Sequence, residues 1–133
     1  IHKPNGRPFA EHLLDFPSGE LVHFAVSFRT VMMATRLQGP ATRFLPFNQG
    51  DHGGAGNPPN PAGHRTAYLW EQVWQRDSWL EILGRYLVTQ RDSKKKVTGF
   101  IFPRYHQARM VRRVAEEALQ VAARLLVAML TIP

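Results

Sequence analysis

Apolar residues form short alternating runs in the first third of the chain. In residues 20–26 both sets of alternate positions are largely apolar, which predicts a strand buried on both faces. Residues 27–30 have the composition of a turn, and the alternation resumes over 31–37 and again over 42–47. Three neighbouring strands with short connections predict an antiparallel meander, which needs a helix or a second sheet to cover its apolar face.

The spacing of apolar residues becomes helical after Thr66, a candidate N-cap. Residues 67–75 place Trp70 and Trp74 one turn apart, and residues 78–88 begin with the capping-box pattern S-x-x-E. Because the pattern slips between the two ranges, it predicts two helices with a bend between them. The predicted apolar stripe of the second helix consists of Leu80, Leu83 and Leu87.

A charged stretch, TQRDSKKKVT at residues 89–98, separates these helices from the end of the chain. Its composition predicts a basic tether and the best candidate for a domain boundary. After Pro103, helical spacing predicts a helix from Gln107 to Leu130. The second half of this helix is apolar nearly all round, which predicts burial on more than one side.

These elements predict an α+β chain, of the kind that a fragment of an α/β protein would give. It would contain a short, mostly antiparallel sheet of about three strands, a long Gly/Pro loop, two linker helices and a C-terminal helix. Four segments follow from the pattern: an irregular segment (1–19), strands with the loop (20–65), a helical linker with the basic tether (66–98) and the C-terminal helix (99–133).

The loop at residues 48–65 contains five Gly, three Pro and three Asn, and loops of this length are usually functional or disordered. Its glycines could wrap a phosphate, but no Lys follows them and two prolines block the helix that a P-loop requires. Asp51, His52 and His64 could bind a metal ion, but their spacing matches no metal motif. The alternative is a loop whose glycines adopt positive φ. We assign no metal ligand and no catalytic residue.

Composition limits the classes of protein to which the chain can belong. Its 133 residues are 44% hydrophobic, close to the globular average, and contain no cysteine, so disulfides and thiolate ligands are excluded. No apolar run reaches the roughly 20 residues that span a bilayer, so a membrane partner is not expected. The formal charge of +7 and the pI near 10.6 are equally consistent with nucleic-acid binding and with a solvated basic surface.

Several residue sets could contact nucleic acid or a nucleotide. The tryptophans could stack on single-stranded bases, although their helical spacing favours packing against the strands. In the motif IFPRYHQ, an aromatic-arginine turn precedes Gln107, whose amide could match the edge of adenine; a simple helix start is the alternative. The candidate phosphate contacts are Lys94, Lys95, Lys96, Arg109, Arg112 and Arg113, with Arg112–Glu116 and Arg113–Glu117 as possible neutralising pairs.

Five motifs occur in one order along residues 20–113: LPFN, GGAGNPPNP, AYLWE, QRDSWLEILGR and FPRYHQ. This ordered set resembles the restriction (R) subunits of type I restriction–modification enzymes. The resemblance implies a cytoplasmic bacterial or archaeal DNA translocase and endonuclease that requires ATP and Mg²⁺. Its implied partners are double-stranded DNA and the methylation and specificity subunits of the same complex.

The resemblance also assigns roles to segments of this chain. Residues 20–47 would be late strands of the nuclease domain, and residues 48–98 would bridge to the motor. FPRYHQ would open the first RecA-like helicase domain and assign Gln107 to adenine, with Arg104 as a weaker nucleotide contact. Tyr105 and Phe102 would pack or stack there.

Two motifs of the family are not found. Its nuclease motif, an Asp with a later Glu-x-Lys, lies upstream of the strand at residues 21–26, and IHKPNG does not supply it. Its phosphate-binding GSGK should follow FPRYHQ, where this chain has EEALQVAARLLVAMLTIP instead. We therefore expect a fragment that neither cleaves DNA nor hydrolyses ATP alone and binds no cofactor tightly. The alternatives are a non-catalytic basic module that binds DNA or a partner subunit, and the product of a decayed or frameshifted gene.

Overall fold

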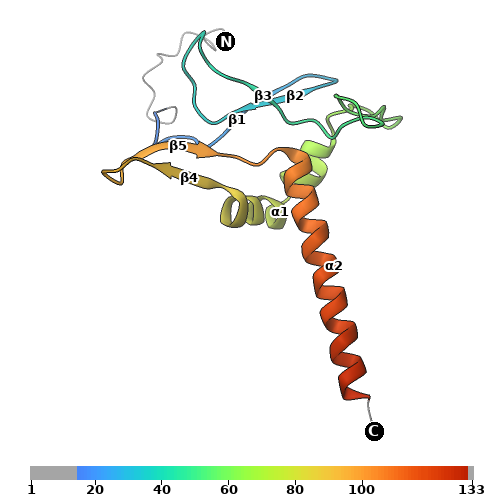
Figure 1. The fold of residues 1–133 in the computed structure, drawn as a ribbon. Coiled ribbons are helices and arrows are strands. Elements are labelled where there is room, and N and C mark those ends of the chain that lie inside the picture. The colour runs from blue at the N-terminus through green and yellow to red at the C-terminus, as the bar shows by residue number, and fades with distance from the viewer. Residues whose placement is uncertain (1–14, 132–133) are drawn as a thin grey trace.

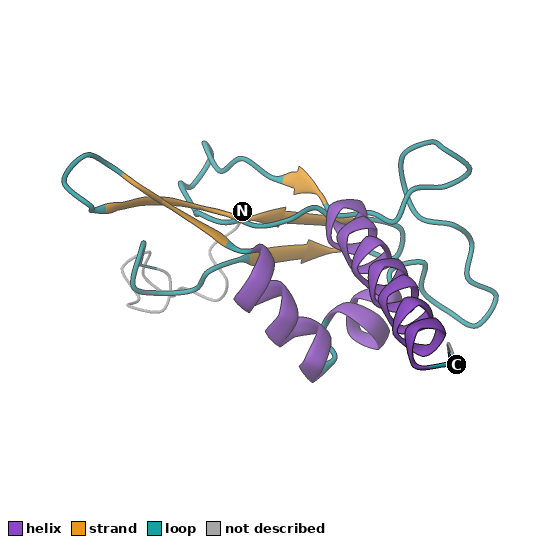
Figure 2. Cartoon of the chain, turned by 60° about the horizontal axis from the view of Figure 1, so that its bottom comes forward, coloured by secondary structure: helices purple, strands orange, loops and turns teal. Residues whose placement is uncertain are grey.

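A computed structural model describes residues 15–131 of the chain, and the predicted irregular segment falls mainly on residues 1–14, outside the described range. Two small antiparallel sheets and a run of short helical turns form a body, from which one long helix projects (Figure 1). The helical segments lie on one side of the strands (Figure 2). The predicted α+β class is confirmed.

The first sheet is the predicted meander, with strand order β1-β2-β3. Its strands are β1 (His23–Val26), β2 (Val31–Ala34) and β3 (Leu45–Pro46), all shorter than the sequence pattern. The turn closes where Ser27 N donates to Thr30 O at 2.9 Å. Burial of β1 on both faces was predicted wrongly: Val26 is 46% exposed, because β1 is an edge strand that pairs only with the central β2.

The two predicted helices are present as three short turns. A π-helical turn, η2 (Leu69–Val73), is followed after a bend by α1 (Arg76–Glu81) and a second π-helical turn, η3 (Ile82–Tyr86). The Thr66 side chain does not cap a helix, because its hydroxyl donates to Ser27 O at 2.9 Å. The predicted stripe is also wrong at Leu80, which is 56% exposed, while Ile82 is buried in its place.

The stretch predicted as a tether is instead an ordered β-hairpin. Strands β4 (Val88–Arg91) and β5 (Val97–Ile101) pair antiparallel with a bulge at Gln90/Arg91. Asp92 Oδ1 accepts hydrogen bonds from Lys94 N and Lys96 N, both at 2.9 Å, and Lys95 adopts a φ of 61°. An Asp that bonds the backbone of the residues after it is a turn signal that the lysine run obscured.

Aromatic rings fill the centre of the body. Phe24, on β1, contacts four other rings at centroid distances of 5.4–6.3 Å, namely those of Phe47, Trp74, Trp79 and Phe102. This edge-to-face packing contributes beyond the buried area alone. The prediction that tryptophans pack against the strands is thus confirmed for two of them; Trp70 instead contacts His64 and is 41% exposed.

The long helix α2 (Tyr105–Leu130) begins two residues earlier than predicted and ends where predicted. Tyr105 is its one residue classed as buried, and the second half stands away from the described part of the chain (Figure 1). The burial predicted for residues 118–130 is therefore not found within the described residues.

Two asparagines fasten the Gly/Pro loop to the sheet. Asn57 is 3% exposed; its Nδ2 donates to Arg29 O at 3.0 Å and to Asn48 Oδ1 at 2.8 Å, and its Oδ1 accepts from Gln49 N at 2.8 Å. Asn48 Oδ1 also accepts from Val31 N at 2.8 Å. Through these bonds the buried Asn57 amide joins the loop to the β1–β2 turn and to the residues that follow β3.

Replacing Asn57 with Ala should therefore destabilise the fold by about 2–4 kcal/mol, because it leaves buried backbone groups unpaired. Urea unfolding followed by tryptophan fluorescence measures this change. Asn60→Ala is the matched control, since the Asn60 side chain bonds only exposed loop backbone, and it should cost less than about 1 kcal/mol. Equal losses for the two variants would contradict the structural role given to Asn57.

Candidate functional site

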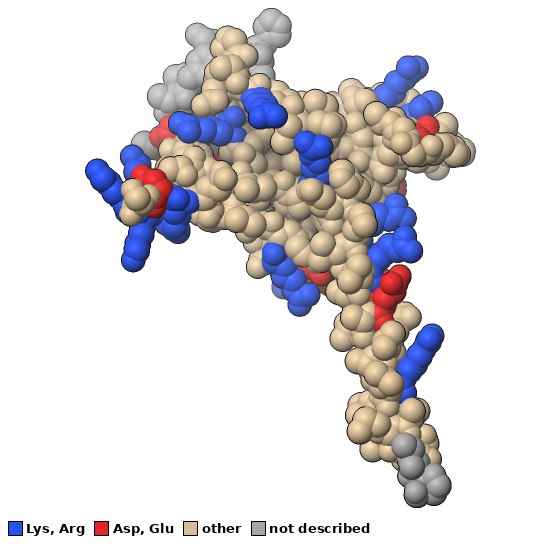
Figure 3. All heavy atoms as spheres, viewed as in Figure 1, with Lys and Arg blue, Asp and Glu red and all other residues tan. Residues whose placement is uncertain are grey.

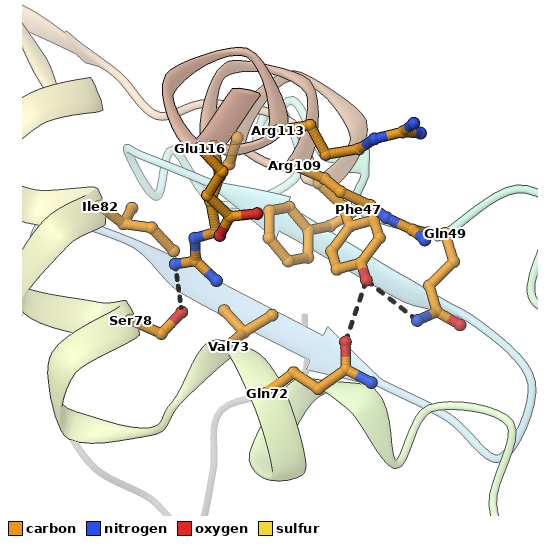
Figure 4. Close-up of a pocket in the computed structure, with 12 residues that line it drawn as sticks. Phe47, Gln49, Gln72, Val73, Ser78, Ile82, Arg109, Arg113 and Glu116 are labelled. Carbon is orange, nitrogen blue, oxygen red and sulfur yellow. Dashed lines mark hydrogen bonds between the residues drawn. The ribbon is translucent and has the colours of Figure 1, made fainter. Parts of the chain in front are cut away.

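A cleft of about 380 Å³ lies between the helical turns and the first part of α2 (Figure 4). Its lining combines aromatic rings from the core with amides and guanidinium groups, including Phe47, Gln49, Gln72, Tyr105, Arg109 and Arg113. The cleft exists because α2 leaves the body at an angle to η2 and α1, so that only its first turns contact them. A mixed apolar and polar lining of this kind suits a ligand with a flat ring or an anionic group.

The floor of the cleft is a hydrogen-bonded tyrosine. Gln49 Nε2 donates to the Tyr105 hydroxyl at 3.1 Å, and that hydroxyl donates to Gln72 Oε1 at 3.2 Å. The Tyr105 ring also stacks edge-on against Tyr68 at 4.9 Å between centroids. The loop, η2 and α2 are thereby joined at one side chain. No local sequence pattern predicts this network, because its members are far apart along the chain.

A nearby tyrosine has lost contact with solvent. The Tyr68 hydroxyl donates to Phe47 O, and Tyr68 is 4% exposed. Burial raises the pKa of Tyr68 far above its ordinary value, so the phenol stays neutral and acts as a hydrogen-bond donor. It serves the architecture of the cleft and cannot act as a base near neutral pH.

Arg112 links α2 to α1. Its Nη2 and Nε donate to Glu81 Oε2 at 2.7 and 3.1 Å, and Nη2 also donates to Ser78 Oγ at 3.2 Å. The predicted capping box is therefore wrong: Ser78 and Glu81 bind an arginine, and the N-cap residue of α1 is Gln75 with no side-chain cap. The predicted Arg112–Glu116 neutralisation is likewise replaced by this pair with Glu81.

Arg109 and Arg113 are the cations left available beside the cleft. Both are exposed and lie one turn apart on α2, and Figure 4 shows both extending away from Ser78. Within residues 15–131 neither forms an ion pair, so the predicted Arg113–Glu117 pair is not made. Two unpaired guanidinium groups at this spacing can together contact a phosphate.

Gln107 lies in the first turn of α2, outside the cleft. Its Oε1 accepts a hydrogen bond from Arg104 N at 3.0 Å, which caps the start of the helix. Its amide nitrogen has no partner among the described residues. Arg104 and His106 line a separate hollow of about 430 Å³ with the glycine loop. The two nucleotide candidates, Arg104 and Gln107, are thus neighbours at the start of α2, and the side-chain carbonyl of Gln107 already accepts one hydrogen bond.

The lysines of the candidate DNA contacts lie elsewhere. Lys94, Lys95 and Lys96 are exposed at the tip of the β4–β5 hairpin, whereas the arginines lie on α2. Figure 3 shows these two groups of basic side chains on opposite sides of the body. The six predicted phosphate contacts thus form two separate patches, and one of the six, Arg112, is already paired.

The glycine loop has the positive-φ conformation that was predicted as the alternative to phosphate or metal binding. Gly50, Gly53 and Gly56 have φ of 84°, 82° and 103°, values that only glycine adopts readily. His52 Nδ1 lies 2.6 Å from Asp51 Oδ1. The ring of His64 instead contacts the rings of Phe28 and Trp70. In the described part of the chain, no group of three or more metal-ligand side chains comes together.

No family model, curated protein or solved structure matches the chain. Among residues 15–131, no helix is both long enough and apolar enough to cross a membrane.

The link between α2 and α1 should be measurable by a double-mutant cycle. Arg112 is 40% exposed and Glu81 26% exposed, so solvent screens the pair; we expect a coupling energy of about 0.5–1.5 kcal/mol between Arg112→Ala and Glu81→Ala. Urea unfolding of the original chain, the two single variants and the double variant gives this coupling energy, and 1 M salt should reduce it. Arg113→Ala with Glu81→Ala is the control cycle, for which additivity is expected. Coupling of equal size in both cycles would contradict the assignment.

Proposed function

We propose that this chain is the junction between the nuclease and the first motor domain of a type I restriction enzyme R subunit. Support comes from where the motif residues lie. LPFN supplies Phe47, GGAGNPPNP supplies Asn57, AYLWE supplies Tyr68, and FPRYHQ supplies Phe102 and Tyr105; all five are buried within one connected set of contacts.

That convergence carries the proposal. Motifs spread over some sixty positions by chance would not be expected to share one core, whereas motifs of one structural unit would. The arrangement also suits a junction: Phe47 directly follows β3, α2 begins at Tyr105, and the centroids of the two rings lie 5.9 Å apart. A motor domain attached through α2 would therefore have a fixed direction relative to the strands.

The nucleotide role within this proposal belongs to Gln107 and Arg104. With Gln107 Oε1 accepting from the backbone, its amide N–H₂ is left to donate to a ring nitrogen of adenine. The carbonyl retains a second lone pair for the exocyclic amine. Arg104, exposed beside it, offers a guanidinium plane. The whole enzyme would need ATP and Mg²⁺. The protein groups that bind the ATP phosphates and the Mg²⁺ ion would come from outside these residues.

A chimaera tests the proposal. Residues 20–113 should replace the corresponding segment of an active R subunit of the family and preserve ATP-dependent DNA translocation, because the core and both ends of the junction are kept. The readout is translocation by the chimaera assembled with its methylation and specificity subunits. A chimaera that assembles normally but does not move DNA would refute the proposal.

Gln107→Glu in that chimaera separates the two roles of the side chain. Glutamate keeps the acceptor for Arg104 N but loses the donor, so the helix start should stay intact while ATP affinity falls about ten- to a hundredfold. Gln107→Ala is the comparison, which should lose both and cost about 1 kcal/mol of stability as well. Unchanged ATP affinity in Gln107→Glu would leave Gln107 as a helix cap only.

A second candidate function, non-catalytic binding of double-stranded DNA, is favoured by the basic hairpin tip. Lys94, Lys95 and Lys96 follow one another on a tight turn that projects from the body (Figure 3). The Asp92 carboxylate accepts from the backbone N–H groups of Lys94 and Lys96, which orders the turn, and the side chains of all three lysines are exposed. A narrow basic projection of this kind can contact successive phosphates.

Removing the three lysines together should weaken DNA binding at low salt and lower the slope of log affinity against log salt by about 2–3. Fluorescence anisotropy with a labelled duplex over a salt series measures both quantities. The triple variant R29A/R43A/R76A is the control, because it removes the same charge from exposed positions scattered over the body. Identical behaviour of the two variants would mean that only net charge matters.

A further inference from the structure

The second half of α2 is an unusual surface for a water-exposed helix. Beyond Glu117, Arg124 is its one charged residue. Large apolar side chains there are more than half exposed, with Val121 at 54%, Leu125 at 61% and Met129 at 72%. Figure 3 shows this region as a largely uncharged arm below the body. A patch of this size on a projecting helix marks an interaction surface.

One row on this helix has the spacing of a coiled coil. Steps of three and four residues alternate without interruption from Val111 to Ala128, as in the a and d positions of heptads. The members of this row, which we call the heptad row, are Val111, Val114, Ala118, Val121, Leu125 and Ala128. All six are exposed.

The heptad row points away from the protein's own body. At about 100° per residue, the members from Val114 to Ala128 lie on the side of α2 opposite Arg112, which is bonded to Glu81, and Val111 lies at the edge of that side. Tyr105 and Ala108, which line the cleft, also lie on the Arg112 side. A second helix can therefore run along the heptad row without meeting the strands or the short helical turns.

We propose that two copies of this chain associate by antiparallel pairing of their α2 helices along the heptad row. In the central register, Val111 of one copy faces Ala128 of the other, Val114 faces Leu125, and Ala118 faces Val121. Each contact then occurs twice about a two-fold axis, as closed homodimers require. An alanine opposes a valine in two of these three pairings, which lets the two helices approach closely. The inference rests on the surface of α2 and makes no use of the proposed function.

Charge complementarity between the two helices favours a second copy of the chain in the antiparallel orientation. Glu117 and Arg124 flank the same edge of the heptad row, one heptad apart, and both are exposed. In the antiparallel register, Glu117 of each copy faces Arg124 of the other, so two ion pairs form. In a parallel pair, both positions would face alanine or methionine instead, at Ala122 and Met129 of the other copy.

Charge reversal gives a direct test. Glu117→Arg and Arg124→Glu should each weaken self-association about tenfold, because two attractive pairs become two repulsive ones. The double reversal should restore it. Sedimentation equilibrium of the full chain gives the dimer dissociation constant, with circular dichroism as the check that α2 remains helical. Leu125→Asp, which places a charge inside the heptad row, should give a monomer.

Crosslinking supplies a second measurement that does not depend on affinity. The chain has no cysteine, so Ala118→Cys mixed with Val121→Cys under mild oxidation should give a covalent heterodimer in preference to either homodimer. A chain that stays monomeric at every concentration overturns the proposal. So does a dimer that is indifferent to the single reversals, or one that crosslinks best between two copies of Ala118→Cys.

Discussion

The buried amide of Asn57 is the interaction on which the rest of the body depends. It bonds Arg29 O in the β1–β2 turn and Asn48 and Gln49 after β3, and Asn48 Oδ1 in turn accepts from Val31 N on β2. A loop with five glycines has many conformations in the unfolded state, so ordering it costs conformational entropy. The loop has few apolar side chains to offset this cost. One fully satisfied amide replaces them, and this fixes the position from which Thr66 and Tyr68 enter the core.

With the loop held, the start of α2 becomes part of the same core. Phe102 and Tyr105 pack on Phe47, and the Tyr105 hydroxyl is shared by Gln49 and Gln72. Gln107, the one position that the motif resemblance assigns to a nucleotide, lies two residues after this anchor. A ligand at Gln107 would therefore act on a helix turn that the strands already hold, and Arg112 would carry any displacement of α2 to α1.

The sequence predicted those elements whose cause is local. The β1–β2 turn, the meander and the long helix follow from residue periodicity, and glycine-dependent loop geometry follows from composition. The hairpin at residues 88–101 was missed because its turn depends on the Asp92 carboxylate, while the lysines suggested a solvated linker. Ser78 and Glu81 fit a capping box in sequence, but α1 begins at Arg76, so Ser78 lies inside the helix, and Arg112 of α2 binds both side chains. The candidate site residues remain predictions, and their division into two patches could not be predicted because it depends on how the hairpin and α2 are placed.

The positive charge of this chain is best understood as several separate roles rather than one basic surface. Arg112 is structural, since its guanidinium is engaged by α1. Arg109 and Arg113, on the same helix but without such a partner among the described residues, border an aromatic cleft. The hairpin lysines stand apart on a rigid turn. Arg124 lies where the helix has left the body and its neighbours are apolar. Because a net charge of +7 is divided in this way, long-range attraction to an anion would act on the whole chain, whereas recognition would depend on which of these groups is free to pair.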